Sequence, residues 1–203
     1  MTVFYLVRHG VTEHTGHKLS GLMAGLDLTA EGLKQAELVA GHLAETPLKA
    51  IYSSPLERCR QTAEVVARRH RGLTVRALPA LGEVDYGSWT GRSLRTVART
   101  KLWTSVQRWP SRVRFPEGEA IREVQARAVN AIEEIAARHP KQHVCCATHS
   151  DVIRVLVTHY VGSHLDMYDR IVTAPGSVTV IALGTGAPPR VVALNVVPQE
   201  PPV

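Results

Sequence analysis

The chain of 203 residues has few aromatic residues, only three cysteines and no long apolar segment. Because the cysteines are odd in number and lack zinc-finger spacing, they indicate small buried side chains rather than a disulfide framework or a metal site. No apolar run reaches the ~18 residues of a membrane span, and Met1-Thr2 leads directly into an apolar strand. These absences predict a cytoplasmic protein with no signal or transit segment and no membrane partner.

Histidine is frequent, at ten residues, but the histidines are scattered without an HxH or HExxH pattern. The chain also lacks the glycine-rich loop with which nucleotide-binding proteins cradle phosphates. We therefore expect neither a metal ion nor another cofactor in the functional site.

Basic residues outnumber acidic ones, 24 to 18, which gives a net charge of +6. The segment 92–114 contains seven basic residues, two tryptophans and no acid. Three interpretations are open: a solvated helical face whose tryptophans pack on the core, an electropositive lid over a phosphate site, and a surface for single-stranded nucleic acid. No nucleic-acid-binding motif accompanies the charge, so we expect no nucleic-acid partner.

Apolar strand-like segments alternate with amphipathic helical ones along most of the chain. This alternation predicts an α/β fold of three layers, α/β/α, with a mostly parallel sheet between two helical layers. Two β-branched segments, 177–183 and 190–196, are joined through Gly184–Pro189 and predict an antiparallel hairpin at the sheet edge. At 44% hydrophobic residues, we expect a single domain over 1–203 with a small helical cap at about 91–118. The expected strands are 3–7, 50–53, 74–78 and 143–148, and the expected helices are 30–44, 55–70, 120–138 and 151–161.

Two histidines follow predicted buried strands, at the points where those strands end. Arg8-His9-Gly10 follows the apolar run that opens at Val3, and His149 follows the run 144–148. The carboxyl ends of parallel strands face the usual ligand crevice of an α/β fold. A histidine at a strand end is more often structural than catalytic, so each motif alone is weak evidence for function.

A third strand end and a glycine-punctuated loop add an arginine and a carboxylate. After the strand 50–53, Ser54 as N-cap and Pro55 in the first turn predict a helix that carries Arg58 in its first turn. Glu83 lies in the loop, between Gly82 and the glycines at 87 and 91.

These residue types match the requirements of phosphoryl transfer. The reaction needs positive charge around three oxygens, an in-line nucleophile and a proton for the departing alkoxide. Arg8 and Arg58 offer planar forks to phosphate oxygens, and His149 can donate further hydrogen bonds. A neutral His9 nitrogen is a competent nucleophile, and a desolvated Glu83 holds a proton for the leaving oxygen.

Taken in order, the Arg8-His9-Gly10 triplet, Arg58, Glu83 and His149 resemble the histidine phosphatase superfamily, also called phosphoglycerate mutase-like. The similarity is to its phosphatase branch, close to small bacterial phosphomutases and broad-specificity phosphatases. It covers nearly the whole chain, and the matching segments are 6–12, 28–36, 53–63, the loop around 83, and 148–153.

The resemblance implies a phosphoglycerate mutase-like fold in which His9 forms a phosphohistidine and Glu83 is the acid that later activates water. It implies a metal-independent phosphomonoesterase whose partner is a small acidic phosphorylated metabolite. A phosphoglycerate mutase-type phosphomutase is the alternative, and a basic single-stranded nucleic-acid-binding module is the alternative of another class. The oligomeric state, monomer or homodimer, is left open.

Five residues besides the arginines and histidines are candidate substrate contacts. Thr12 matches a threonine of the family, whereas Thr15 stands where the family carries asparagine, so a turn-stabilising hydroxyl is an equal alternative for it. Ser20-Gly21 matches a loop that approaches the substrate in relatives, although it is also ordinary turn chemistry. Ser150 directly follows the strand-end His149.

Overall fold

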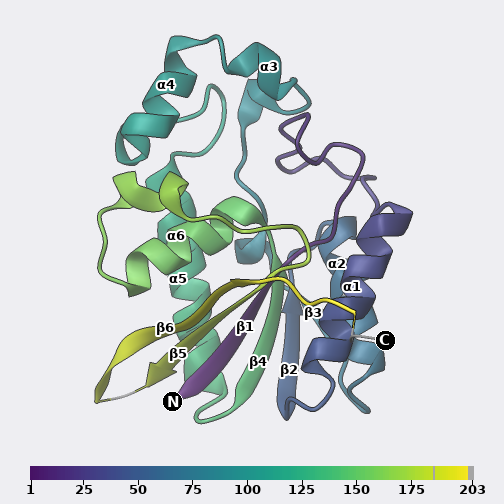
Figure 1. Cartoon of the computed structure of the whole chain (residues 1–203). Coiled ribbons are helices and arrows are strands. Elements are labelled where there is room, and N and C mark those ends of the chain that lie inside the picture. The colour runs from purple at the N-terminus through teal and green to yellow at the C-terminus, as the bar shows by residue number, and fades with distance from the viewer. Residues whose placement is uncertain (185, 201–203) are drawn as a thin grey trace.

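A computed structural model describes residues 1–184 and 186–200. Six strands form its one sheet: β1 (Thr2–Arg8), β2 (Leu48–Ser53), β3 (Val75–Ala77), β4 (His143–Thr148), β5 (Val178–Gly184) and β6 (Ala187–Val196). Their order is β3-β2-β4-β1-β5-β6 (Figure 1). The first four strands pair in parallel, and β5 and β6 add an antiparallel edge, as predicted. Thr185, in the predicted hairpin connection, and residues 201–203 of the expected domain lie outside the described residues.

Helices cover both faces of the sheet. They are α1 (Ala30–Leu43), α2 (Glu57–Arg68), α3 (Leu94–Val97), α4 (Lys101–Arg108), α5 (Ile121–Arg138) and α6 (Ser150–Tyr160). Side-chain alternation along each strand separates two cores: Phe4 and Leu6 of β1 join the side of α5 and α6, whereas Val7 joins that of α1 and α2. The predicted three-layer α/β fold is confirmed. None of the described helices is both long and apolar enough to cross a membrane.

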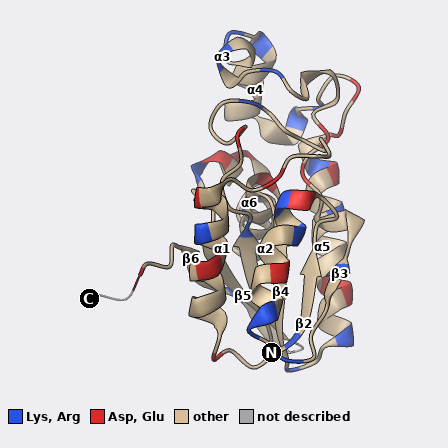
Figure 2. Cartoon of the chain, turned by 90° about the vertical axis from the view of Figure 1, so that its right-hand side faces the viewer, with Lys and Arg blue, Asp and Glu red and all other residues tan. Residues whose placement is uncertain are grey.

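The segment 91–118 stands beyond the carboxyl ends of the parallel strands and carries α3 and α4 (Figure 1). Each of these short helices begins at a side-chain cap: the Ser93 hydroxyl accepts from the Thr96 N–H at 3.1 Å, and the Thr100 hydroxyl accepts from the Trp103 N–H at 3.2 Å. Lys and Arg positions are blue in Figure 2, and the seven basic residues of 92–114 are all exposed. The positive charge of the segment therefore lies on its solvated face.

The helix that follows β1 begins as predicted, and the one that follows β2 does not. The Thr29 hydroxyl accepts from the Gly32 N–H at 3.1 Å and caps α1. Ser54 does not cap α2, which starts two residues later with Leu56 as N-cap and no side-chain cap. The Ser54 N–H donates to the Ala147 oxygen of β4 at 2.9 Å, so this residue is tied to the end of the sheet.

Two glycines let the turn after β1 pack directly on the first turn of α1. A Cβ on Gly10 would lie 2.3 Å from the carbonyl oxygen of Gly32, and a Cβ on Gly32 would lie 2.2 Å from that of Val11. No side chain fits at such distances. Glycine at both positions therefore fixes the backbone next to His9 against α1.

We predict that Gly32→Ala lowers the free energy of unfolding by about 1–3 kcal/mol, because the new methyl group pushes the turn away from α1. Gly41→Ala in the same helix is the matched control, since nothing lies within 4 Å of its Cβ position. This control should raise stability by up to ~1 kcal/mol through helix propensity. Urea unfolding followed by circular dichroism measures both. Equal effects of the two substitutions would contradict the close approach.

Candidate active site

The register of the parallel sheet brings His9 and His149 together. β1 and β4 are neighbours in which Arg8 pairs with Thr148, and the His9 N–H donates to the Thr148 oxygen at 3.1 Å. Each histidine is the next residue after this pair. Their ring centroids lie 5.2 Å apart, with 66° between the ring planes.

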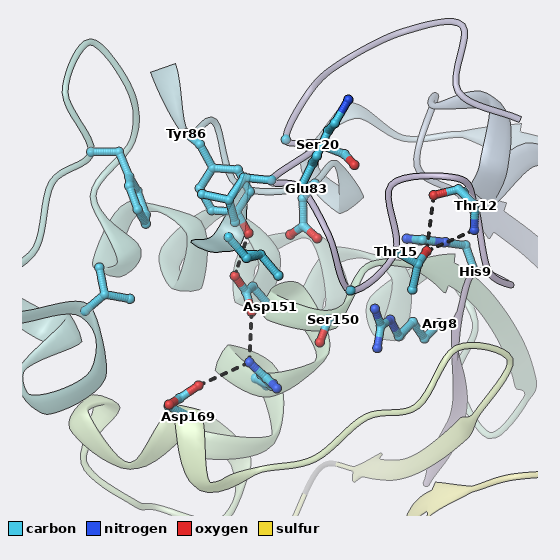
Figure 3. Close-up of a pocket in the computed structure, with 18 of the residues that line it drawn as sticks. Arg8, His9, Thr12, Thr15, Ser20, Glu83, Tyr86, Ser150, Asp151 and Asp169 are labelled. Atoms are coloured by element: carbon cyan, nitrogen blue, oxygen red, sulfur yellow. Dashed lines mark hydrogen bonds and ion pairs between the residues drawn. The ribbon is translucent and has the colours of Figure 1, made fainter. Parts of the chain in front are cut away.

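A cavity of about 370 Å³ opens at these strand ends, with the segment 91–118 forming part of its wall (Figure 3). This volume suits a small ligand. His149 is wholly buried against His9 and does not line the cavity. The other predicted site residues all line it: Arg8, His9, Thr12, Thr15, Ser20, Gly21, Arg58, Glu83 and Ser150.

The ring of His9 has one nitrogen free for chemistry. Its Nδ1 lies 2.7 Å from the carbonyl oxygen of Gly10. Because a carbonyl oxygen only accepts, we assign the proton to Nδ1 and the lone pair to Nε2. Burial, and then the charges of Arg58 and Arg8, lower the pKa of His9 to about 3. The imidazole is therefore neutral, and nucleophilic at Nε2, at physiological pH.

Two cavity arginines are held by backbone carbonyls, and the Nε–H of each is buried without a partner among the described residues. Arg8 Nη1 donates to the Thr173 oxygen at 2.5 Å. Arg58 donates from Nη2 to the Gly21 oxygen at 2.8 Å and from Nη1 to the Met23 oxygen at 3.2 Å. Both Nε–H groups are buried without a partner among the described residues. Because an unmade buried hydrogen bond is costly, these groups are ready to bind an anion.

Glu83 is buried beside the histidines. Its Oε1 accepts from the Val84 N–H at 3.0 Å, and its Oε2 lies 3.9 Å from Nδ1 of His149. Burial, and then the negative charge of Asp151, raise the pKa of Glu83 to about 7. A large share of Glu83 is therefore protonated at neutral pH, as a proton donor requires.

His149 is oriented by the residue that the sequence assigned to a helix cap. Its Nε2 lies 2.8 Å from the Ser54 hydroxyl and 3.3 Å from Sγ of Cys59. Burial, and then the charge of Arg58, hold the pKa of His149 well below its usual value. We assign the ring proton to Nδ1, the nitrogen that lies 3.9 Å from Glu83 Oε2, and Nε2 then accepts from the Ser54 hydroxyl.

Two of the further predicted contacts also hold the cavity walls together. The Thr15 hydroxyl accepts from the Thr12 N–H at 2.9 Å and lies 3.1 Å from the Thr12 hydroxyl, so it stabilises the turn (Figure 3). The Ser150 hydroxyl lies 2.8 Å from that of Thr173. Contacts of these side chains with a substrate are still predictions.

A charged cluster in the cavity wall was missed by the sequence analysis. The Tyr86 hydroxyl donates to Oδ2 of Asp151 at 2.8 Å. Arg154 Nη1 lies 3.3 Å from both Asp151 Oδ1 and Asp169 Oδ1 (Figure 3). The spacing of Asp151 and Arg154 on one helix was a usable signal, because residues three apart are neighbours. Nothing in the sequence pattern marked Tyr86 or Asp169.

The cap segment 91–118 presents an apolar wall to the cavity. Leu94, Trp103 and Val106 line it, together with Gln107. Among the described residues of the segment, none of the seven basic ones lines the cavity. Positive charge inside the cavity comes from elsewhere, chiefly from Arg8 and Arg58.

The cysteines are free and buried, as predicted. In the part of the chain that the structure describes, no three histidine, cysteine or acidic side chains converge to hold a metal ion.

Comparison with known proteins finds a matching family model and many similar proteins, of which three are given. The family model described as histidine phosphatase superfamily (branch 1) matches residues 4–197. The chain is 33% identical over 172 residues to phosphoserine phosphatase 1 of Hydrogenobacter thermophilus, which covers 83% of this chain and 80% of that protein. It is 30% identical over 170 residues to a Proteus mirabilis protein named probable phosphoglycerate mutase GpmB, with 80% and 76% covered. The solved structure of Bacillus stearothermophilus YhfR matches at a TM-score of 0.89 and 27% identity, over 97% of this chain and 98% of that one.

We predict that Asp151→Asn lowers the pKa of Glu83 below about 7, because a neighbouring negative charge that favours the protonated form is removed. Titration of the Glu83 carboxyl carbon by NMR in labelled protein measures it. Asp27→Asn is the matched control: Asp27 is exposed, and its Oδ1 accepts from Gln61 instead. An unchanged pKa of Glu83 in the Asp151 variant would show that the charge of Asp151 does not contribute to it.

Proposed function

This chain belongs to the histidine phosphatase superfamily (branch 1), and we propose that it hydrolyses phosphate monoesters through a phosphohistidine at His9. The protein is a phosphomonoesterase of this superfamily. One observation supports the assignment of the site most directly. The free Nε2 of His9 shares a buried cavity with two guanidinium groups whose Nε–H groups lack partners among the described residues.

In the first step, Nε2 of His9 attacks phosphorus, and the bond from phosphorus to the ester oxygen breaks. Glu83 gives its proton to the departing alkoxide, so the alcohol leaves neutral. Arg8 and Arg58 stabilise the charge on the three transferring oxygens. His149 does not line the cavity, and it packs against His9 with Nδ1 toward Glu83.

In the second step, water replaces the alcohol. The Glu83 carboxylate takes a proton from the water as its oxygen attacks phosphorus, and the bond from phosphorus to Nε2 of His9 breaks. Inorganic phosphate leaves, and both side chains return to their starting protonation states. The chemistry uses only side chains of this chain, since the arginines supply the positive charge.

The substrate class that we propose is a small acidic phosphorylated metabolite. Besides Arg8 and Arg58, the cavity is lined by side chains of both charges. Lys18 and Arg154 are basic, and Asp151 and Asp169 are acidic. Mixed charge of this kind suits an alcohol that carries both an ammonium and a carboxylate group, such as the serine part of phosphoserine. The name of the Hydrogenobacter thermophilus relative refers to that substrate.

We further propose that the cap segment 91–118 acts as a lid, because Trp103 and Val106 line the cavity from it. We assign the protein to the cytoplasm, where reduced cysteines such as its three free ones persist.

A phosphomutase is the second candidate, because the Proteus mirabilis relative is named as a phosphoglycerate mutase. In that reaction the phosphohistidine returns its phosphoryl group to a second oxygen of the substrate instead of to water. Phosphorus NMR of the enzyme with 3-phosphoglycerate separates the two, since hydrolysis yields inorganic phosphate and the mutase yields 2-phosphoglycerate.

We predict that the protein releases phosphate from phosphoserine in buffer that contains EDTA, and that His9→Ala lowers this rate at least ~10³-fold because the nucleophile is lost. A panel of phosphoserine, phosphoglycerates, sugar phosphates and nucleotides ranks the substrates. His17→Ala is the control, since the side chain of His17 is exposed and does not line the cavity. Near wild-type hydrolysis by the His9 variant, or activity that returns only with a divalent ion, would overturn the mechanism.

A second prediction separates the two roles of Glu83. An alkyl phosphate leaves as a poor alkoxide, whereas p-nitrophenolate leaves readily without a proton. Glu83→Gln should therefore slow phosphorylation of His9 by an alkyl phosphate on the order of 10²-fold, and by p-nitrophenyl phosphate much less. Rapid-quench trapping of phosphoenzyme isolates this step. Equal losses with both substrates would mean that Glu83 only shapes the cavity.

A further inference from the structure

One arginine outside the active cavity binds three backbone carbonyls of the chain that leads into and includes Glu83. Arg127 of α5 donates from Nη1 to the carbonyl oxygens of Ala80 at 2.7 Å and Gly82 at 2.9 Å. Its Nη2 donates to the carbonyl oxygen of Glu83 itself at 2.9 Å. A single guanidinium thus fixes three carbonyls in a stretch of four residues, which no shorter or less branched side chain can do.

A carboxylate completes this clamp from the other side. Arg127 Nε donates to Glu119 Oε1 at 2.8 Å, and Arg127 Nη2 donates to Glu119 Oε2 at 3.0 Å. This is the bidentate pairing of a guanidinium with a carboxylate. The same Oε2 accepts from the Asp85 N–H at 3.0 Å, and the Glu119 N–H donates to the Asp85 oxygen at 2.9 Å. The backbone on both sides of Glu83 is therefore tied to one ion pair.

The loop is also packed too closely to move on its own. A Cβ on Gly118 would lie 2.3 Å from the Asp85 oxygen, so the segment before Glu119 lies directly on the Glu83 loop. On the other side, the Thr148 hydroxyl of β4 donates to the Leu81 oxygen at 2.7 Å. The sheet holds the loop at Leu81, and Arg127 holds it at Glu83.

Arg127 does not line the active cavity, and it borders a separate cavity of about 340 Å³ on the outer side of the loop. Its side chain and that of Glu119 are only 23% and 25% exposed. An ion pair screened from water to this degree has a defined geometry, unlike the exposed pairs of the surface.

We propose that Arg127 is a positioning residue for the general acid: it holds the Glu83 backbone so that the carboxyl group meets the leaving oxygen. The inference rests on the proposed role of Glu83 as proton donor. Without the clamp, the carboxyl group still reaches the cavity but loses the fixed distance that proton transfer needs. The loss is therefore confined to substrates that need the proton.

The test compares Arg127→Gln with Arg138→Gln, a matched control on the same helix. Among the described residues, Arg138 pairs only with Glu134, at 3.0 Å on the exposed surface, so its loss removes the same charge without touching the loop. Rapid-quench phosphorylation of His9 is measured with an alkyl phosphate and with p-nitrophenyl phosphate. Arg127→Gln should slow the alkyl reaction on the order of tenfold and the p-nitrophenyl reaction by less than about twofold. The alkyl loss is smaller than that expected for Glu83→Gln, because the acid is misplaced and not removed. Arg138→Gln should change neither.

A double-mutant cycle decides between positioning and general damage. In a Glu83→Gln background, Arg127→Gln should cause no further loss with the alkyl phosphate, because the group that it positions is already gone. Losses that multiply, or equal losses with both substrates, would overturn the inference. If Arg127→Gln does not fold, Arg127→Lys decides, because the three N–H donors of its ammonium group cannot replace the five hydrogen bonds of the guanidinium. A selective loss then supports the inference, and wild-type rates refute it.

The same data distinguish this inference from the function on which it rests. If Glu83→Gln slows the reactions of both substrates equally, Glu83 is not the general acid. If Glu83→Gln slows mainly the alkyl phosphate but Arg127→Gln slows both substrates equally, Glu83 is the acid and only the positioning role of Arg127 is refuted.

Discussion

The site depends on placing two guanidinium groups beside a buried imidazole without protonating it. Burial and the charges of Arg58 and Arg8 act on His9 in the same direction and lower its pKa to about 3. The same burial acts on the carboxyl group of Glu83 in the opposite direction and raises its pKa to about 7. One desolvated environment thus yields an unprotonated nucleophile and a protonated acid at neutral pH, the division of protons that phosphoryl transfer from an ester needs.

The fold supplies the positions for this pair of environments. Parallel pairing of β1 with β4 sets His9 next to His149, and the antiparallel edge leaves this junction inside the sheet. The Gly10 carbonyl directs the Nδ1 proton of His9, and the close packing of Gly10 on Gly32 prevents that carbonyl from moving. Backbone geometry, rather than a further side chain, therefore selects the reactive nitrogen.

The sequence predicted the residues that follow strand ends, because strand period and turn chemistry are local signals. It placed Arg58 correctly but assigned Ser54 to a helix cap, since a local pattern does not show that Ser54 meets His149 in the fold. The role of Arg127 could not be predicted for the same reason, because its carbonyl partners lie 44 to 47 residues earlier in the chain. By itself, an arginine on an amphipathic helix indicates an exposed face. One of the three interpretations of the basic segment was a solvated face whose tryptophans pack on the core. Its charges are solvated and Trp103 packs on the core, but Trp109 is 51% exposed. The apolar inner wall of the segment depended on tertiary packing, which the sequence does not show.

The central claim is that the phosphoryl group passes through Nε2 of His9. The most direct measurement is to mix enzyme with ³²P-labelled substrate, quench within milliseconds under alkaline conditions, and locate the label by mass spectrometry and phosphorus NMR. We predict a label that is stable in base and labile in acid, on Nε2 of His9, and formed and lost fast enough to account for turnover. A label on another residue, or turnover with no phosphoenzyme and inversion of configuration at phosphorus, would contradict the account.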